Sequence, residues 1–297
     1  MKQDNYIGID VGGTKIEGVV CNINGDVSKR YKVLSRPGNG NVIADILHVV
    51  SMLSEEPTSI GIGIPGTVDN EQGIVQSVVN LDVDMLPLRE KICEVYDARV
   101  CVENDVNAAA YGAYISVKKE YAKETVAFLN LGTGLATGVV QAGILNEGTS
   151  GAVGEIGHLP VDKHGFPCIC GQSGCLETVC SGAALAKLWP EVTPPMPDIL
   201  TRAAKGEVKA KEVLSMFLHA VGDALQIIVQ TFDPHIILVG GGISRSGELL
   251  LQVMQDEMRA RASHSDFLRG LAIDQRIRLV DQNIPIGAIG AALAHVI

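Results

Sequence analysis

Apolar and polar residues alternate near the start of the chain in the way that β-strands require. Residues 6–21 (YIGIDVGGTKIEGVVC) place β-branched side chains on both sides of a Gly-Gly-Thr turn, and residues 59–66 (SIGIGIPG) form another apolar stretch that ends in a turn. Alternation around a glycine turn is typical of a β-hairpin, and a short apolar run is typical of a buried strand. The sequence therefore predicts a hairpin over 6–21 and a buried strand over 59–66.

Longer segments carry apolar residues at helical spacing, with shorter apolar runs between them. We expect helices over 41–53, 87–97, 106–117, 181–189, within 198–232, and over 284–297. Further strands are expected over 73–79, 99–102 and 235–239, with a proline-rich connection over 190–197. Strands that alternate with helices in this way predict an α/β protein.

Part of the first hairpin recurs later in the chain. Residues 10–20 (DVGGTKIEGVV) align without a gap with residues 130–140 (NLGTGLATGVV). The identical pairs are Gly12/Gly132, Gly18/Gly138, Val19/Val139 and Val20/Val140. Chance can produce such matches in a chain rich in glycine and valine, but each copy also reads strand, glycine turn, strand. We therefore predict two similar lobes that grip one nucleotide between them.

The composition favours a globular protein with two lobes. With 297 residues, of which 46% are hydrophobic, the chain is long and apolar enough to fill them. Its formal net charge of −10 argues against non-specific nucleic-acid binding, which needs basic patches. No apolar run approaches the ~20 residues that span a bilayer, and the start (MKQDNYIGID) lacks the regions of a signal peptide. We expect a cytoplasmic protein that does not bind membranes.

The turn of the first hairpin has the composition of a phosphate cradle. Gly12 and Gly13 allow backbone amides to approach a ligand closely, and Thr14 and Lys15 add a hydroxyl and a cation. Asp10 lies at the end of the first strand, where a carboxylate could hold a metal ion. An ordinary glycine hairpin turn is the alternative.

Other glycine clusters need separate interpretations. The turn of the repeat is Gly132-Thr133-Gly134, and the strand over 235–239 runs into Gly240-Gly241-Gly242, after which a helix is expected. A flat adenine ring could lie against the bare backbone of the second cluster, although a tight turn is the alternative. The formal G-x-G-x-x-G motif from Gly61 to Gly66 does not predict a dinucleotide site, because Pro65 occupies the turn and no helix follows.

An acid and an amide meet where the strand over 99–102 leads into the next helix. Glu103-Asn104-Asp105 precede the small-residue segment VNAAAYGAYISV. Side chains at such a junction project into a cleft, which suits catalysis, but aspartate is also a favoured N-cap residue. Composition leaves capping and catalysis as alternatives for Asp105.

A cysteine-rich loop follows the repeat. Cys168, Cys170 and Cys175 lie within eight residues, among glycine, proline and serine residues that let the thiols converge. Three thiolates and an imidazole suit a closed tetrahedral zinc site, with His158 or His164 as the histidine. Three core thiols are the alternative. Two flanking glutamates, at positions 155 and 177, have no role in such a site and need another explanation.

Four cysteines lie outside this loop. Cys21, Cys93 and Cys101 lie in apolar strand-like or helix-like contexts and are expected to be buried thiols. The context of Cys180 favours neither burial nor exposure. In a reducing compartment the three clustered cysteines favour metal binding over a disulfide.

Together these motifs resemble the ROK-family sugar kinases, which have a two-lobed actin/hexokinase/Hsp70-like (ribonuclease H-like) α/β fold. The motifs occur in the family's order: D-x-G-G-T-K at 10–15, E-N-D at 103–105, L-G-T-G at 131–134, G-E-x-G-H at 154–158, C-x-C-G-x-x-G-C-x-E at 168–177 and G-G-G at 240–242. The resemblance covers 6–297 and implies an inserted zinc-binding loop. It also implies an N-terminal lobe over 1–118 completed by the helix over 281–297, a C-terminal lobe over 119–280, and a homodimer.

The resemblance implies ATP-dependent phosphorylation of the primary (6-) hydroxyl of a hexose, with Asp105 as general base. The sugar would be held by Gly66, Asn80, Asn104, Asp105, Glu155, His158 and Glu177. The nucleotide would be held by Asp10 through Mg²⁺, by Gly12, Gly13, Thr14 and Lys15, by Gly132, Thr133 and Gly134, and by Gly240, Gly241 and Gly242. A structural zinc bound by His158, Cys168, Cys170 and Cys175 would turn Glu155 and Glu177 toward the sugar. His158 is favoured over His164, because its second ring nitrogen can donate to a hydroxyl.

One departure from the family pattern bears on which hexose is the substrate. Many glucose-type members carry a tryptophan soon after an Asn-Leu pair, whereas Asn80-Leu81 is followed by DVDMLPL and the only tryptophan is Trp189. The missing tryptophan and the segment ETVCSG at 177–182 are features in which the chain resembles allose kinases. The carboxylates predicted to bind the sugar suit N-acetylmannosamine equally well. Glucose is expected first, as the commonest substrate. A sugar-responsive ROK repressor is the alternative from another class, disfavoured because no DNA-binding domain precedes Asp10.

Overall fold

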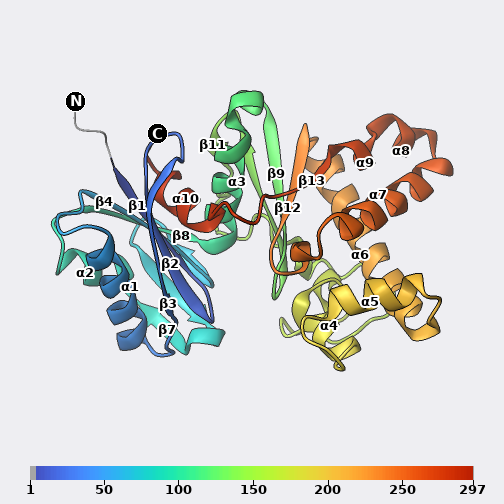
Figure 1. The fold of residues 1–297 in the computed structure, drawn as a ribbon, viewed down its shortest axis with the longest axis horizontal. Helices are drawn as coiled ribbons and strands as arrows, with labels where there is room; N and C mark the ends of the chain where they lie inside the picture. Colours follow the sequence, from blue (N-terminus) through green and yellow to red (C-terminus); the bar gives the residue numbers. More distant parts are fainter. Residues whose placement is uncertain (1–4, 297) are drawn as a thin grey trace. The chain divides into compact units, whose positions relative to one another are not determined.

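The computed structural model describes residues 5–296, and its contacts divide the chain into two compact units (Figure 1). The first unit comprises the described parts of Met1–Ala122 and Asn283–Ile297 together with Gly138–Val153. The second comprises Lys123–Thr137 and Gly154–Gln282. The functional lobes predicted above differ from these units chiefly at Gly138–Val153, and their boundaries stay a prediction.

The first unit is built on a five-stranded sheet. Its strands are β1 (Tyr6–Val11), β2 (Lys15–Cys21), β3 (Val27–Leu34), β4 (Ser59–Ile64) and β8 (Arg99–Asn104), in the order β3-β2-β1-β4-β8. β1 and β2 form the predicted hairpin, closed by a hydrogen bond from the Gly12 N–H to the Lys15 carbonyl. β4 lies parallel to both β1 and β8, so these three strands end at one edge of the sheet.

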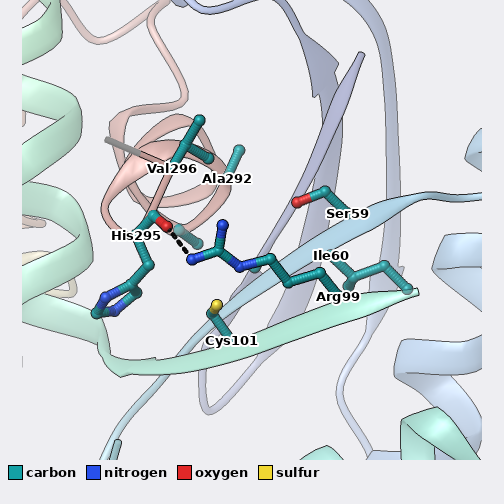
Figure 2. A pocket seen from close by; sticks show the side chains of 9 residues that line it. Ser59, Ile60, Arg99, Cys101, Ala292, His295 and Val296 are labelled. Carbon is teal, nitrogen blue, oxygen red and sulfur yellow. Dashed lines mark hydrogen bonds between the residues drawn. The ribbon is translucent and has the colours of Figure 1, made fainter. Parts of the chain in front are cut away.

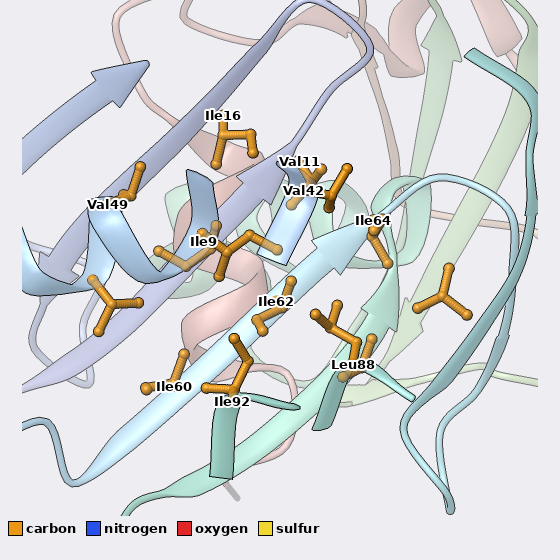
Figure 3. Close-up of a cluster of buried hydrophobic side chains, with 14 of the residues drawn as sticks. Ile9, Val11, Ile16, Val42, Val49, Ile60, Ile62, Ile64, Leu88 and Ile92 are labelled. Atoms are coloured by element: carbon orange, nitrogen blue, oxygen red, sulfur yellow. The ribbon is translucent and has the colours of Figure 1, made fainter. Parts of the chain in front are cut away.

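The I-G-I pattern that β1 and β4 share places isoleucines on one face of this sheet and glycines on the other. Buried isoleucine and valine side chains occupy one face, where they pack with α1 (Asn39–Leu53) and α2 (Leu88–Cys93). Figure 3 shows Ile9, Ile62 and Ile64 from the strands meeting Val49 of α1 and Ile92 of α2. Burial of these side chains supplies the core of the unit.

Glycines on the opposite face let α10 (Ile286–Leu293) approach the strands closely. A Cβ added to Gly8 would lie 1.8 Å from the Ala288 carbonyl oxygen, and one added to Gly61 would lie 1.7 Å from that of Ala291. The same helix packs on α3 (Asp105–Tyr121). α10 therefore belongs to the same compact unit as β1, β4 and α3.

A small three-stranded sheet follows β4. It consists of β5 (Thr67–Asp69), β6 (Ile74–Val78) and β7 (Val83–Leu86) in that order, and the 3-10 turn η1 (Val79–Leu81) joins the last two. A strand, and not a helix, therefore follows Gly66, as expected for a sequence that binds no dinucleotide there. Asn80, expected in a loop, lies within η1.

The second five-stranded sheet repeats the topology of the first. Its strands are β9 (Thr125–Leu131), β10 (Leu135–Gln141), β11 (Ile144–Leu145), β12 (Ile236–Gly240) and β13 (Ile277–Leu279), in the order β11-β10-β9-β12-β13. In both sheets a hairpin is extended by an antiparallel strand on one side and by two parallel strands on the other. The internal repeat is therefore confirmed, with β9–β10 matching β1–β2.

The helices of the second unit correct two expectations. They are α4 (Gly182–Leu188), α5 (Pro195–Ala204), α6 (Val208–Phe232), α7 (Glu248–Ser263), α8 (Asp266–Leu271) and α9 (Ile273–Arg276). The proline-rich connection ends at Pro194, because proline suits the first turn of a helix, where its missing N–H would have no partner. After Gly242 a 3-10 turn, η4 (Ile243–Ser246), precedes the expected helix.

α6 is the one helix within residues 5–296 that is long and apolar enough to cross a membrane. Half of the segment that meets this test is buried inside the protein. The buried side chains include those of the predicted apolar stripe: Val213, Phe217, Val221, Leu225 and Ile228. A core helix of this kind passes the same test of length and composition.

Candidate active site

Asp105 begins α3 directly after β8, where the chain leaves the edge of the first sheet. The N-cap of α3 is Asn104, whose side-chain oxygen accepts hydrogen bonds from the N–H groups of Val106 (2.9 Å) and Asn107 (3.2 Å). Because Asn104 caps the helix, capping no longer explains Asp105. Asp105 occupies the first helical position, where the helix dipole favours a carboxylate.

Asn104 also connects this junction to the turn after β4. Its Nδ2 donates to the Gly66 carbonyl over 3.2 Å. Gly66 has a φ of 99°, and an added Cβ would lie 2.5 Å from the Gln76 carbonyl oxygen, so the turn requires glycine. Since capping uses both acceptor positions of the Asn104 oxygen, its remaining amide hydrogen is what Asn104 can offer a sugar.

Asn80 lies beside the first glycine turn. A Cβ added to Gly13 would lie 3.4 Å from the Asn80 Cβ, an ordinary packing distance. The Gly38 N–H donates to the Leu81 carbonyl over 2.6 Å and thereby fixes η1. A residue expected to hold the sugar therefore neighbours residues expected to hold phosphate, as phosphoryl transfer requires.

Asp10 lies near the end of β1, on the sheet face that α10 covers. A Cβ added to Gly287, in the first turn of that helix, would lie 2.7 Å from the Asp10 carboxylate. Burial and the nearby charge of Glu17 raise the pKa of Asp10 to about 6, against the opposing effect of Lys15. A bound cation would stabilise the charged form of such a carboxylate, so Asp10 fits the predicted role of holding Mg²⁺.

Glu17 gathers three cations, an arrangement that is not evident from the sequence. β2 and β3 pair so that Glu17 faces Lys32. The buried Glu17 carboxylate forms ion pairs with Lys15 (3.2 Å), Lys32 (3.3 Å) and Arg30. Although burial opposes its ionisation, hydrogen bonds from Arg30 and Lys15 lower the pKa of Glu17 overall. Lys15, predicted to contact a phosphate, is thereby oriented by Glu17.

In the second unit, the turn Gly132-Thr133-Gly134 is held by the start of α4. The Gly182 N–H donates to the Gly132 carbonyl over 2.8 Å, and the Ala183 N–H donates to the Thr133 carbonyl over 3.1 Å. A further bond of 3.1 Å joins the Gly132 N–H to the Gly134 carbonyl. The turn is thus fixed mainly through its carbonyl groups, which suits a cradle whose amides face a phosphate.

The cluster Gly240-Gly241-Gly242 combines a packing role with an open side. Gly241 has a φ of 84°, and an added Cβ would lie 2.5 Å from the Leu131 carbonyl oxygen. Packing against β9 therefore explains Gly241 without a ligand. An added Cβ at Gly242 would meet no atom within 4 Å among the described residues, so Gly242 leaves the room that an adenosine would need.

Side chains of the cysteine-rich loop converge on one point. The ligand atoms of His158, Cys168, Cys170 and Cys175 all lie within 4.8 Å of one another. The Cys168 Sγ lies 3.6 Å from the His158 Nδ1, and the Cys170 and Cys175 Sγ atoms are 3.6 Å apart. Ligands about 2.3 Å from a tetrahedral zinc are separated by roughly 3.8 Å, so this donor set fits the ion.

His164, the other histidine considered for this site, makes contacts outside the cluster. Its Nδ1 lies 2.9 Å from the Asp162 Oδ1, and its ring stacks on Phe166. These contacts favour His158 as the fourth ligand.

The two glutamates flank His158. Glu155 Oε2 lies 3.9 Å from His158 Nε2, and Glu177 Oε1 lies 3.6 Å from His158 Nδ1. Burial raises the pKa of Glu155, an effect that His158 opposes and Glu177 reinforces. Glu177 Oε1 is also 3.3 Å from the Cys168 Sγ, while its Oε2 would be 3.2 Å from a Cβ added to Gly134. Glu177 therefore bridges the cysteine cluster and the predicted phosphate turn.

The remaining cysteines are less uniform than expected. Cys21 and Cys180 are fully buried, and burial raises the pKa of the Cys21 thiol to about 12. Cys93 is exposed because it ends the short helix α2, which corrects the expectation of a buried thiol. Cys101 is partly exposed, because it lies on the β8 face opposite to the buried Val100 and Val102.

The predicted site residues form one group in each unit. The first unit holds Asp10, Gly12, Gly13, Thr14, Lys15, Gly66, Asn80, Asn104 and Asp105. The second holds Gly132, Thr133, Gly134, Glu155, His158, Cys168, Cys170, Cys175, Glu177, Gly240, Gly241 and Gly242. Each unit therefore contains one of the two hairpin turns predicted to bind the nucleotide and some of the residues predicted to bind the sugar.

This architecture, a five-stranded sheet that recurs with the same topology, is that of the sugar kinases. The profile of the ROK family matches residues 6–293, and the chain belongs to the ROK family. The resemblance drawn from the sequence motifs is confirmed.

Relatives of similar identity include enzymes and regulators. The glucokinase of Halalkalibacterium halodurans is 30% identical over 286 residues, which cover 86% of each chain. The xylose repressor of Bacillus subtilis is 30% identical over 267 residues, covering 86% of this chain and 68% of the repressor. Family membership alone therefore leaves both activities open.

Solved structures of the family have the same fold. The ROK family glucokinase from Streptomyces griseus, in complex with glucose and AMPPNP, superimposes with a TM-score of 0.77 at 30% identity, covering 97% of this chain and 98% of that one. For the ROK hexokinase from Thermus thermophilus the TM-score is 0.76 at 25% identity, covering 98% and 97%. The fold is therefore the α/β fold of the ROK sugar kinases.

Proposed function

We propose that this protein is an ATP-dependent hexose kinase that phosphorylates the primary (6-) hydroxyl of its sugar. The observation that carries the proposal is the junction of β8 and α3, where Asn104 caps the helix and Asp105 lies at its first position, directly after the end of the strand. The glucokinase relatives and the glucose and AMPPNP complex of a family member support the same activity.

In the proposed reaction, Asp105 accepts the proton of the sugar hydroxyl as its oxygen attacks the γ-phosphorus of ATP. The new O–P bond replaces the bond between the γ-phosphorus and the bridging oxygen, and ADP leaves. Asn104 and His158 donate hydrogen bonds to the ring hydroxyls, and Glu155 and Glu177 accept them. Catalysis would rest on positioning and charge neutralisation.

The nucleotide would be held mainly by backbone groups. The turns at Gly12–Lys15 and Gly132–Gly134 would contact its phosphates, and Gly240–Gly242 its adenosine. Mg²⁺, when bound, supplies charge neutralisation at the phosphates, and Asp10 is the residue that would hold it, through water. Exclusion of water from this site would limit hydrolysis of ATP.

We propose a structural role for zinc held by His158, Cys168, Cys170 and Cys175. This ion would fix the loop that carries Glu155 and Glu177 and would take no part in phosphoryl transfer. Dimerisation through the C-terminal lobe and a cytoplasmic location belong to the same proposal.

Glucose is the proposed substrate, with allose and N-acetylmannosamine as the next choices. The glucokinase relatives favour glucose, and the missing tryptophan after Leu81 favours the others. A sugar-responsive regulator without kinase activity is the second candidate, because a xylose repressor is equally similar in sequence. Such a protein would bind a sugar without consuming ATP.

A coupled assay of ADP formation over a panel of hexoses tests the proposal. Asp105→Asn should lower kcat by about 10²- to 10⁴-fold, with sugar affinity retained. Asp266→Asn is the matched control, because Asp266 also begins a helix, follows a capping residue and is exposed. Sugar binding without turnover of any hexose would overturn the kinase proposal, whereas full activity of Asp105→Asn would overturn the assignment of the base.

A further inference from the structure

Glu103, directly before the proposed pair Asn104-Asp105, is buried and fully hydrogen-bonded. Its Oε1 accepts from the Asn104 N–H (2.8 Å) and the Asn107 Nδ2 (3.0 Å). Its Oε2 accepts from the Asn70 Nδ2 (2.9 Å) and the His295 Nε2 (3.0 Å). With four protein donors around one carboxylate, this cluster is a hydrogen-bonded network that leaves Glu103 no acceptor position for a ligand.

His295 is the basic side chain of this network. It follows α10, 192 residues away from Glu103 in the sequence. Figure 2 shows it beside Arg99, whose guanidinium donates to the His295 carbonyl over 2.6 Å. The charged groups that face the imidazole are Glu103, Glu147 (3.8 Å from Nδ1) and Arg99. The hydrogen bond to Glu103 and the charges of both glutamates raise the pKa of His295, against burial and Arg99.

We infer that Glu103 and His295 are positioning residues that hold Asn104 and the first turn of α3, and through them Asp105. Glu103 binds the backbone of Asn104 and the side chain of Asn107, one turn into α3. Asn104 in turn caps α3 and binds the Gly66 carbonyl. A shift of the Glu103 carboxylate would therefore move the start of α3. The inference rests on the proposed role of Asp105 as the base.

The network should respond to pH on the alkaline side. Protonated His295 makes a charge-assisted hydrogen bond to Glu103, which is stronger than a neutral one. Since the pKa of His295 is raised, this bond is complete at low pH and weakens as the pH rises through the raised pKa. Glutamine at position 295 can donate a hydrogen bond but does not titrate, so His295→Gln should remove this alkaline dependence.

The test combines kinetics, sugar binding and NMR on the full chain. His295→Gln should lower kcat about tenfold, with the sugar Kd and the KM for ATP changed by less than about threefold, because misplacing a catalytic group affects the chemical step most. The NMR titration of His295 should show a pKa above that of an exposed histidine, and Glu103→Gln should lower it. His235→Gln is the matched control, because His235 forms an exposed ion pair with Glu124.

Several results would overturn the inference. One is a His295→Gln protein whose kcat and pH profile equal those of the wild type and of His235→Gln. Another is a His295 pKa that does not change in Glu103→Gln. If that variant does not fold, a wild-type His295 pKa no higher than the roughly 6.5 of an unperturbed histidine would have the same meaning. If the wild type phosphorylates no hexose, the proposed function fails separately. In that case the NMR resonance of the Asp105 amide still tests the positioning role. A shift of this resonance in His295→Gln but not in His235→Gln would support the role, and no shift in His295→Gln would refute it.

Discussion

The crossing of α3 and α10 can be tested with one methyl group. A Cβ added to Gly290 would lie 1.6 Å from the Ala108 carbonyl oxygen and 2.6 Å from the Gly112 nitrogen. Both obstacles are backbone atoms, so no rotamer change relieves the overlap. Moving α10 away from α3 would disturb its close contacts with Gly8 and Gly61 of the sheet. Gly290→Ala should therefore lower the free energy of unfolding of the first unit.

The size of this effect follows from opposing contributions. Alanine is favoured over glycine within a helix by up to about 1 kcal/mol. Overpacking of a well-packed site costs about 1–3 kcal/mol, and more where the backbone must move. The overlap with the Ala108 carbonyl places Gly290 at the upper end of that range. We expect a net destabilisation of about 2 kcal/mol or more, a large fraction of the 5–15 kcal/mol typical of a domain.

Urea unfolding followed by circular dichroism measures this difference. Gly270→Ala is the matched control, because Gly270 also lies within a helix, α8, and an added Cβ would meet no atom within 4 Å among the described residues. The urea midpoint of unfolding of Gly270→Ala should equal that of the wild type or lie slightly above it. Equal midpoints for Gly290→Ala and Gly270→Ala would refute the close crossing of α3 and α10.

The remaining predictions concern zinc and Glu17. Removal of zinc by a chelator, or the substitution Cys175→Ser, should weaken sugar binding far more than ATP binding, because the positions of Glu155 and Glu177 depend on the zinc loop. Cys175→Ser should also abolish metal binding. Calorimetric titration with sugar and with ATP checks this, and an unchanged sugar affinity of the metal-free protein would contradict it. Glu17→Gln should cost about 1–2 kcal/mol at neutral pH, since its partners are partly exposed cations. Because the pKa of Glu17 is lowered, this difference should disappear as the pH falls through that pKa, and a difference independent of pH would contradict the ion-pair explanation.

Local patterns predicted most of the secondary structure. The hairpin over 6–21, the strand over 59–66 and the helix over 41–53 depend on the alternation or helical spacing of neighbouring residues, and each appears with small shifts of its ends. The internal repeat also predicted that two parts of the chain have a similar fold, and the two sheets have the same topology. The order of the family motifs along the chain added the prediction of which segments bind the sugar, the nucleotide and the zinc.

Contacts between distant segments could not be predicted in this way. The cations around Glu17 come together through the register of β2 and β3, and the bond between Glu103 and His295 joins residues far apart in sequence. The exposure of Cys93 depends on where α2 ends, which an apolar pattern does not define.

The order of segments in the first unit has a consequence for biosynthesis. Its last part, from Asn283 onward, follows the 129 residues of Gly154–Gln282, which belong to the second unit. At about 5–20 residues per second, a ribosome needs roughly 6–26 seconds to make that stretch. During this time the glycine face of β1 and β4 lacks α10, and Glu103 lacks His295. The nascent chain can therefore complete the surroundings of Asp105 only after the second unit has been synthesised, and a chaperone that shields this face in the interval would raise the yield of folded protein.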